Sequence, residues 1–211
     1  MTSMPHIANL EIALDLSTAQ RSAERVRTML QDLRARHDLA RFEYTRQVRI
    51  APMEIPHSHP VLTLNTWVCD ETGLLCGYLH EQMHWYLTWY SHAHPARWRT
   101  LYQALLARYP DAPTAPPAGA PDRFSTYLHL VINWLEVDAV ACLLDRDTVI
   151  RHVSALPFYA WMYRTVIADW KALGALYTDH AVIPLRPATS MSAEDLRLAA
   201  TVDDGAPIDA G

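Results

Sequence analysis

The sequence predicts an α+β protein: a small mixed sheet near the N-terminus, in the order strand, helix, strand, strand, then a long helix and a mainly helical C-terminal half. Strand-like segments occur before residue 70, and helical spacing of apolar residues dominates the remainder. The chain has 211 residues, half of them apolar, and can bury one sizeable core. We expect a single domain over residues 1–187. Small and acidic residues without an apolar period predict a disordered tail over residues 188–211, apart from a short turn at 193–199.

The N-terminal elements follow from alternation and capping. Residues 9–16 alternate between apolar and polar side chains, as a half-buried strand does. Ser17 or Thr18 can cap the helix that follows, in which apolar residues recur every three or four positions. Residues 42–50 alternate again, and residues 61–68 are rich in β-branched and aromatic side chains. These two segments are the second and third predicted strands.

The C-terminal elements are helices separated by prolines. A long helix is expected over about 73–90, and another helix follows it. Five prolines within residues 110–121 predict an exposed loop. Asp122 can cap the next long helix, and Pro157 suits the first turn of a helix that reaches about residue 177.

Composition excludes several classes of protein. The net charge of −5 comes without basic clusters, which argues against a nucleic-acid partner and against an acidic membrane surface. The sequence has no signal-peptide pattern and no run of eighteen apolar residues, so we expect a cytoplasmic protein. Cys69, Cys76 and Cys142 lack paired spacing, which argues against both a disulfide framework and a four-cysteine zinc site.

The segment 80–84 carries the strongest chemical signal. His80 and His84 are four residues apart within a predicted helix, so both imidazoles can reach one metal ion. Glu81 lies about a third of a turn from His80 and can reach a water molecule at an open metal position. Zn²⁺ lowers the pKa of such a water, and Glu81 can act as the general base that accepts its proton. This pattern predicts metal-dependent hydrolysis.

This segment, His80-Glu81-Gln82-Met83-His84, together with its lead-in of strand, helix, strand, strand and helix, resembles the zincin metallopeptidases over roughly residues 7–145. The resemblance implies a peptide or protein substrate that adds to an edge strand through main-chain hydrogen bonds. The substrate-binding residues would then include Leu64, Asn65 and Thr66. The same segment can equally be an ordinary core strand.

The third metal ligand decides the subfamily. The continuation typical of metzincins is missing, and His92 and His94 fall where the helix should end, which suits caps better than ligands. Glu136 is the natural candidate, as in gluzincin-like sites, because a carboxylate in so apolar a segment needs a positive partner. The alternative is that Glu136 is exposed to solvent on a polar stripe of its helix.

Other residues of the same region are weaker candidates. Gluzincin relatives often carry an Asp four residues after the ligand Glu, whereas this chain has Val140 there and Asp138 two residues on. Asp138 suits the surface better than the support of a ligand histidine. His129 lies seven residues before Glu136, on the same helical face, and could line the cleft, although a packed or solvated histidine is the more common case.

An oxyanion donor is also expected. Tyr159 and Tyr163 are one turn apart on the helix after Pro157, and either could lean over the zinc ion, with core packing as the alternative. His152 and His180 are weaker candidates for this role.

Two functions compete most directly. The first is a zinc metallopeptidase that uses Glu81 as general base. The second is a non-catalytic, zinc-containing module of the same fold that binds peptides or regulates a partner. A helical interaction protein without metal is a third. The sequence carries no signal for an oligomeric state.

Overall fold

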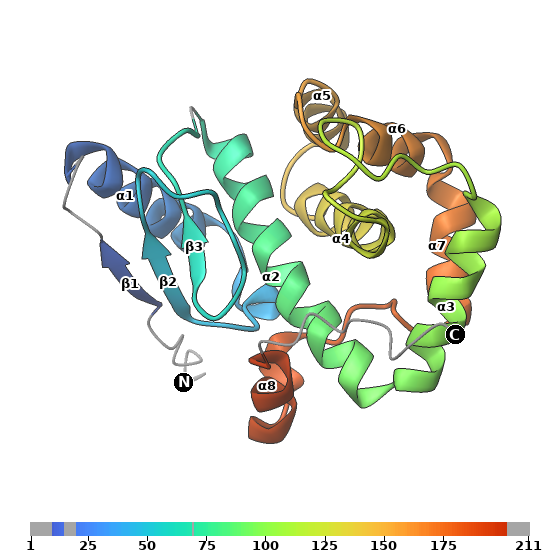
Figure 1. The fold of residues 1–211 in the computed structure, drawn as a ribbon. Coiled ribbons are helices and arrows are strands. Elements are labelled where there is room, and N and C mark those ends of the chain that lie inside the picture. Colours follow the sequence, from blue (N-terminus) through green and yellow to red (C-terminus); the bar gives the residue numbers. More distant parts are fainter. Residues whose placement is uncertain (1–9, 15–19, 69, 202–211) are drawn as a thin grey trace.

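The computed structural model describes residues 10–14, 20–68 and 70–201. Figure 1 shows three parts: a sheet with α1 (Gln20–Arg36), a group of helices α4–α7, and the long helix α2 (Glu71–Ala93) between them. The α+β class is confirmed. None of the described helices has the length and apolar character needed to span a bilayer.

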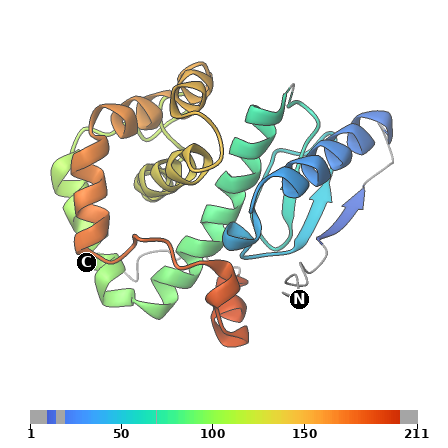
Figure 2. The ribbon, with the colours of Figure 1, turned by 180° about the vertical axis from the view of Figure 1, so that it is seen from behind.

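The sheet is small and entirely parallel. Its strands are β1 (Glu11–Leu14), β2 (Gln47–Ile50) and β3 (Leu62–Leu64), in the order β1-β2-β3. The predicted mixed sheet is therefore wrong. Segment 51–61 carries the chain back along the sheet, so β3 runs in the direction of β2. Seen from behind in Figure 2, α1 lies over the sheet.

The remaining elements are helical. They are η1 (Ala40–Phe42), α3 (Pro95–Arg108), α4 (Arg123–Ala141), α5 (Arg146–Ser154), α6 (Ala160–Ala168), α7 (Trp170–Asp179), η2 (Ala188–Ser190) and α8 (Ala193–Ala199). The single helix predicted after Pro157 is in fact two, because α6 ends at Ala168 and Asp169, in a non-helical conformation, separates it from α7. Helix α5 was not predicted.

Helix α2 forms the centre of the core. Asp70 caps it, because its carboxylate accepts the N–H of Gly73 at 2.8 Å. Buried side chains occur all around the helix, as expected for one covered on several sides. Among the described elements, its most extensive packing is with α4. The candidate site lies where these two helices meet.

The chain remains part of the fold beyond residue 187, where the sequence predicts the tail. Helix α8 begins with a capping box formed by Ser192 and Asp195. The indole N–H of Trp89, on α2, donates to Asp195 at 2.8 Å, and Ala199 is fully buried. These contacts hold α8 against α2, and the rest of the predicted tail, residues 202–211, lies outside the described residues.

Candidate metal centre

Three histidines from two helices converge. His80 and His84 lie one turn apart on α2, and His129 lies on the facing side of α4. Each offers one ring nitrogen, and these nitrogens all lie within 4.8 Å of one another. His80 and His129 are buried, whereas His84 is partly exposed. The cluster therefore has the residue types and the solvent access that a metal centre requires.

The spacing of the rings fits a tetrahedral ion. With metal–nitrogen bonds of about 2.0–2.1 Å and ring centres about 1.2 Å further out, tetrahedral ligands place neighbouring ring centres about 5.2 Å apart. The ring centroids of His80 and His84 are 5.1 Å apart, those of His84 and His129 5.1 Å, and those of His80 and His129 5.5 Å. The ring nitrogens, which lie within 4.8 Å of one another, would still have to approach to about 3.3 Å to share one tetrahedral ion, so metal binding requires the rings to turn or shift.

Hydrogen bonds on the far side of two rings orient them. Nδ1 of His80 lies 2.9 Å from Oε2 of Glu136, and Nδ1 of His129 lies 2.7 Å from the carbonyl oxygen of Ser125. Both acceptors require a hydrogen on Nδ1, which leaves the lone pair of Nε2 for the cluster. Metal-binding histidines in proteins are commonly held in this way.

Burial also sets the protonation of the rings. Burial lowers the pKa of His84 well below its usual value, and the neighbouring His129 and His80 add to the effect. Burial, followed by the charge of His80, lowers the pKa of His129 to about 3. At His80 burial also lowers the pKa, but the hydrogen bond and charge of Glu136 outweigh it and the pKa is raised. Near pH 7, His84 and His129 are therefore neutral, the form that binds metals.

Glu136 takes a different position from the one predicted. Its Oε2 lies 2.9 Å from Nδ1 of His80 and accepts the hydroxyl hydrogen of Tyr163 at 2.8 Å. The group of converging ligand atoms contains His129 and not Glu136. The carboxylate is almost completely buried, and His80 and Tyr163 satisfy it without a metal ion. The geometry thus favours Glu136 as a support of His80 and His129 as the third ligand.

Sequence reasoning noted that His129 shares a helical face with Glu136 but gave it no ligand role. The sequence did contain one signal that pointed to His129. Ser125, His129 and Glu136 lie on one face of a mainly apolar helix, a pattern that calls for a polar partner. The choice between His129 and Glu136 depends on how α4 is placed against α2, which spacing within α4 does not reveal.

Glu81 is buried beside the cluster. Its burial raises the pKa of the carboxyl to about 7, with His80 lowering it and Glu136 raising it. A carboxyl group with a pKa near neutrality can both accept and donate a proton at physiological pH. This property matches the general-base role predicted for Glu81.

The two tyrosines predicted as oxyanion donors occupy different places. The ring of Tyr159 lies 4.5 Å from that of His129 and 6.1 Å from that of His80, measured between centroids. Burial, with the charge of Glu81, raises the pKa of Tyr159 to about 12, so its hydroxyl keeps its hydrogen. Tyr163 instead donates to Glu136, away from the open side of the histidines. Of the two tyrosines, Tyr159 is the one whose ring lies against the histidine cluster, and an oxyanion role for it stays a prediction.

Tyr159 has an unusual backbone conformation. It precedes α6 with φ of 56°, in the left-handed region, which costs a non-glycine residue roughly 1–3 kcal/mol. The N–H groups of Ala160 and Trp161 donate to the carbonyls of Pro117 and Ala118, which anchors this turn to the proline-rich loop. The contacts therefore hold the tyrosine ring against the histidines.

The predicted substrate strand is only partly available. The carbonyl of Leu64 accepts from the N–H of Ala51 and so faces β2. On the outer edge, Thr63 already exchanges two main-chain hydrogen bonds with His57, at 2.8 and 3.1 Å. Asn65 is buried and Thr66 is partly exposed. A substrate role for Leu64, Asn65 and Thr66 stays a prediction, and Leu64 is the least suited to it.

The remaining candidates lie elsewhere. The ring of His92 bonds through Nδ1 to the carbonyl of Thr88 at 2.8 Å, and His94 ends α2 and precedes α3, as expected of residues at a helix end. Nδ1 of His180 bonds to the carbonyl of Leu176 at 2.9 Å. The ligand group contains none of these three.

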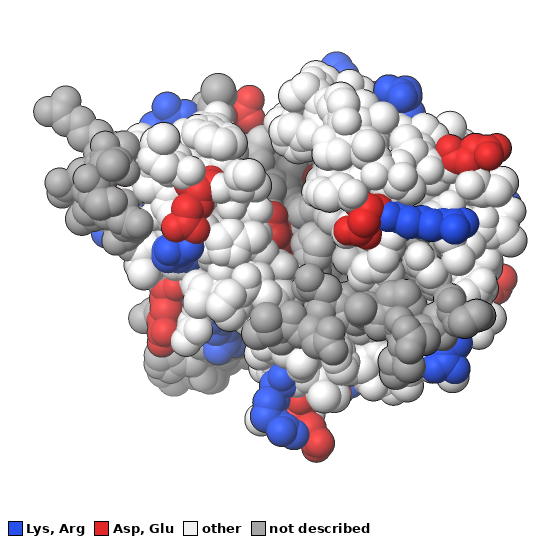
Figure 3. Space-filling view, in the orientation of Figure 1, with Lys and Arg blue, Asp and Glu red and all other residues white. Residues whose placement is uncertain are grey.

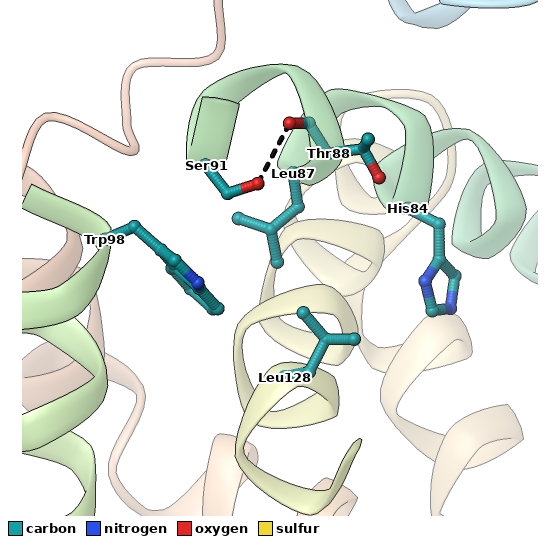
Figure 4. A pocket seen from close by; sticks show the side chains of 6 residues that line it. All are labelled: His84, Leu87, Thr88, Ser91, Trp98 and Leu128. Carbon is teal, nitrogen blue, oxygen red and sulfur yellow. Dashed lines mark hydrogen bonds between the residues drawn. The ribbon is translucent and has the colours of Figure 1, made fainter. Parts of the chain in front are cut away.

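The surface is hollowed in front of this region. Figure 3 shows a recess between the part that carries the sheet and the part formed by the later helices, with acidic atoms visible inside it. A small cavity of about 10 Å³ adjoins His84, and Figure 4 shows its lining residues: His84, Leu87, Thr88, Ser91, Trp98 and Leu128.

Comparisons of the chain with models of protein families, with curated proteins and with solved structures find no match. The function must therefore be argued from the geometry of the site.

Proposed function

We propose that this protein is a zinc-dependent hydrolase that cleaves peptides and whose metal ligands are His80, His84 and His129. The observation that carries the proposal is the convergence of three ring nitrogens within 4.8 Å, with Glu81 buried one residue from the first ligand. Three imidazoles are an established zinc-binding set in catalytic sites, where the fourth position stays open. The choice of peptides as substrates rests on the resemblance of segment 80–84 and its lead-in to zincins.

Zinc held there would supply a Lewis acid that polarises a substrate carbonyl and makes a water molecule more acidic. Glu81 would accept the proton of the attacking water and pass it to the leaving amine, a role suited to its pKa of about 7. The hydroxyl of Tyr159 would donate a hydrogen bond to the oxyanion that develops on the carbonyl. Glu136 would fix the orientation of His80.

The non-catalytic alternative keeps the same three ligands but assigns no reaction to Glu81. A carboxylate buried beside a metal ion only to fill space is costly, because burial penalises its charged form. The placement of Glu81 and Tyr159 around one cluster therefore favours catalysis.

Metal analysis combined with a Glu81→Gln variant tests the proposal. The purified protein should contain one zinc ion per chain, and the variant should retain it, since Gln replaces no ligand. Hydrolysis of a mixed fluorogenic peptide library should fall by roughly 10²–10⁴-fold, the usual contribution of a general base. Glu194→Gln, at an exposed position on α8, is the matched control and should leave both properties unchanged.

Two outcomes would contradict the proposal. If the wild-type protein binds no divalent metal, the metal centre is refuted. If zinc is present but no peptide in the library is hydrolysed, or if Glu81→Gln hydrolyses peptides as well as the wild type, the peptidase mechanism is refuted and the binding module becomes the better assignment.

A further inference from the structure

The cavity beside His84 is closely matched to a single water molecule. Its volume is about 10 Å³, and a site for one water needs roughly 10–15 Å³ on this scale. Three of its lining residues are polar, namely His84, Thr88 and Ser91, and all three lie on α2. Apolar side chains from α2, α3 and α4 line the rest of the space.

His84 also differs from the other two histidines in what lies behind its ring. Glu136 stands behind His80 and the Ser125 carbonyl behind His129, both within hydrogen-bond distance. The imidazole of His84 borders the cavity instead, and Figure 4 shows one of its ring nitrogens on the side facing that space. When one nitrogen of His84 binds a metal ion, the other carries a hydrogen that needs an acceptor.

We propose that a bound water molecule in this cavity is that acceptor. It would take the hydrogen bond of the His84 ring N–H and donate to the hydroxyl of Thr88, so that each of the three ligand histidines has an outer partner. The inference rests on the proposed metal centre, but it does not depend on which reaction the centre catalyses. Ser91 contributes a further acceptor, because its hydroxyl hydrogen is already donated to the Thr88 carbonyl at 2.9 Å.

A substrate side chain is a less suitable occupant. The space of about 10 Å³ lies at the lower limit of the roughly 10–15 Å³ that one water molecule needs, so a group larger than water fits it less well. A water molecule also needs two to four polar partners, and His84, Thr88 and Ser91 supply that number. The size of the cavity and the polarity of its lining therefore both favour a water molecule.

A Thr88→Val variant tests the inference, because valine keeps the shape of threonine and removes only the hydroxyl. The readout is the zinc dissociation constant, measured by competition with a chelator. Loss of an outer partner of a ligand histidine typically weakens metal binding 10–100-fold, and a weakening of at least about tenfold is expected here. Thr100→Val is the control: its hydroxyl bonds one turn back on α3, away from the cavity, and its zinc affinity should equal that of the wild type.

A high-resolution crystal structure of the zinc-loaded wild type gives a second, independent readout. It should show a water molecule within hydrogen-bond distance of His84 and Thr88, and this result does not require any variant to fold. An empty cavity, a substrate-derived group within it, or an unchanged zinc affinity in a folded Thr88→Val variant would overturn the inference. Failure of the wild type to bind zinc refutes the metal centre itself, and so is distinguishable from failure of the water site.

Discussion

At the scale of single residues, the proposed roles of His129 as a ligand and of Glu136 as the outer partner of His80 would determine the chemistry of the metal centre. A histidine ligand leaves the zinc ion with a higher net charge than a carboxylate ligand would, which strengthens its action as a Lewis acid. Glu136, one layer further out, makes His80 a better donor through the hydrogen bond at Nδ1. Both residues lie on α4, seven positions apart.

Exchanging each residue separately distinguishes their roles. His129→Ala removes a ligand and should weaken zinc binding by about three orders of magnitude or more. Glu136→Gln retains a hydrogen-bond acceptor and should weaken it only about 10–100-fold, as outer-shell changes do. Chelator competition measures both constants. A larger loss for Glu136→Gln than for His129→Ala would restore Glu136 as the ligand.

Tyr→Phe variants at positions 159 and 163 can be compared directly, because each removes one hydroxyl with a different predicted role. Tyr159→Phe keeps the ring against His129 and removes only the hydroxyl, so kcat for peptide hydrolysis should fall about 10²-fold, as when one oxyanion donor is lost. Zinc affinity should not change. Tyr163→Phe removes a hydrogen bond to Glu136 and should lower zinc affinity instead. If the two variants showed the opposite effects, the oxyanion role would belong to Tyr163.

At the scale of elements, local patterns were predictable and packing was not. The spacing of His80, Glu81 and His84 within a helix was evident, because residues on one helical face are fixed by the 3.6-residue repeat. The direction of β3 could not be predicted from the sequence, since it depends on the path of segment 51–61. Helix α8 was recognised only as a short turn, because seven residues carry little periodic signal and its position depends on distant Trp89.

The attachment of α8 to α2 should depend on pH. Hydrogen bonds from the side chain and main chain of Ser192 lower the pKa of Asp195 to about 2, below the unfolded value of about 3.9. A lowered carboxyl pKa stabilises the fold above the unfolded value, and this stabilisation is lost as the pH falls from about 4 through about 2.

Hydrogen exchange of the α8 amides measures this effect. In an Asp195→Asn variant, exchange at pH 6 should be faster than in the wild type, and the difference should shrink towards pH 2. Glu194→Gln is the control, because its ion pair with Arg197 is fully solvated and contributes little. Equal exchange rates in Asp195→Asn and wild type at pH 6 would show that this carboxylate does not anchor the helix.

At the scale of the whole molecule, the proposed ligand set comes from two parts of the chain that are far apart in sequence. His80 and His84 come from α2, which packs against the sheet-bearing part, and His129 comes from α4, among the later helices (Figure 1). A metal ion bound to both helices stabilises the native arrangement and has no comparable site in the unfolded chain. Metal binding and folding should therefore be coupled.

Calorimetry can measure this coupling. Free zinc at about a thousand times its dissociation constant should raise the free energy of unfolding by about 4 kcal/mol. For a chain of this length, that corresponds to an increase in Tm of roughly 8–16 °C. His129→Ala should lose most of the increase while remaining folded without metal. An unchanged wild-type Tm would show that the two helices are not bridged by the ion.

The most direct measurement of the metal centre is zinc X-ray absorption spectroscopy on the loaded protein, supported by a crystal structure of the same form. We expect three imidazole nitrogens, from His80, His84 and His129, at about 2.0–2.1 Å from the zinc ion, with one further light atom from solvent. A coordination sphere with two imidazoles and a carboxylate oxygen of Glu136, or zinc bound at a different place in the chain, would contradict the three-histidine centre.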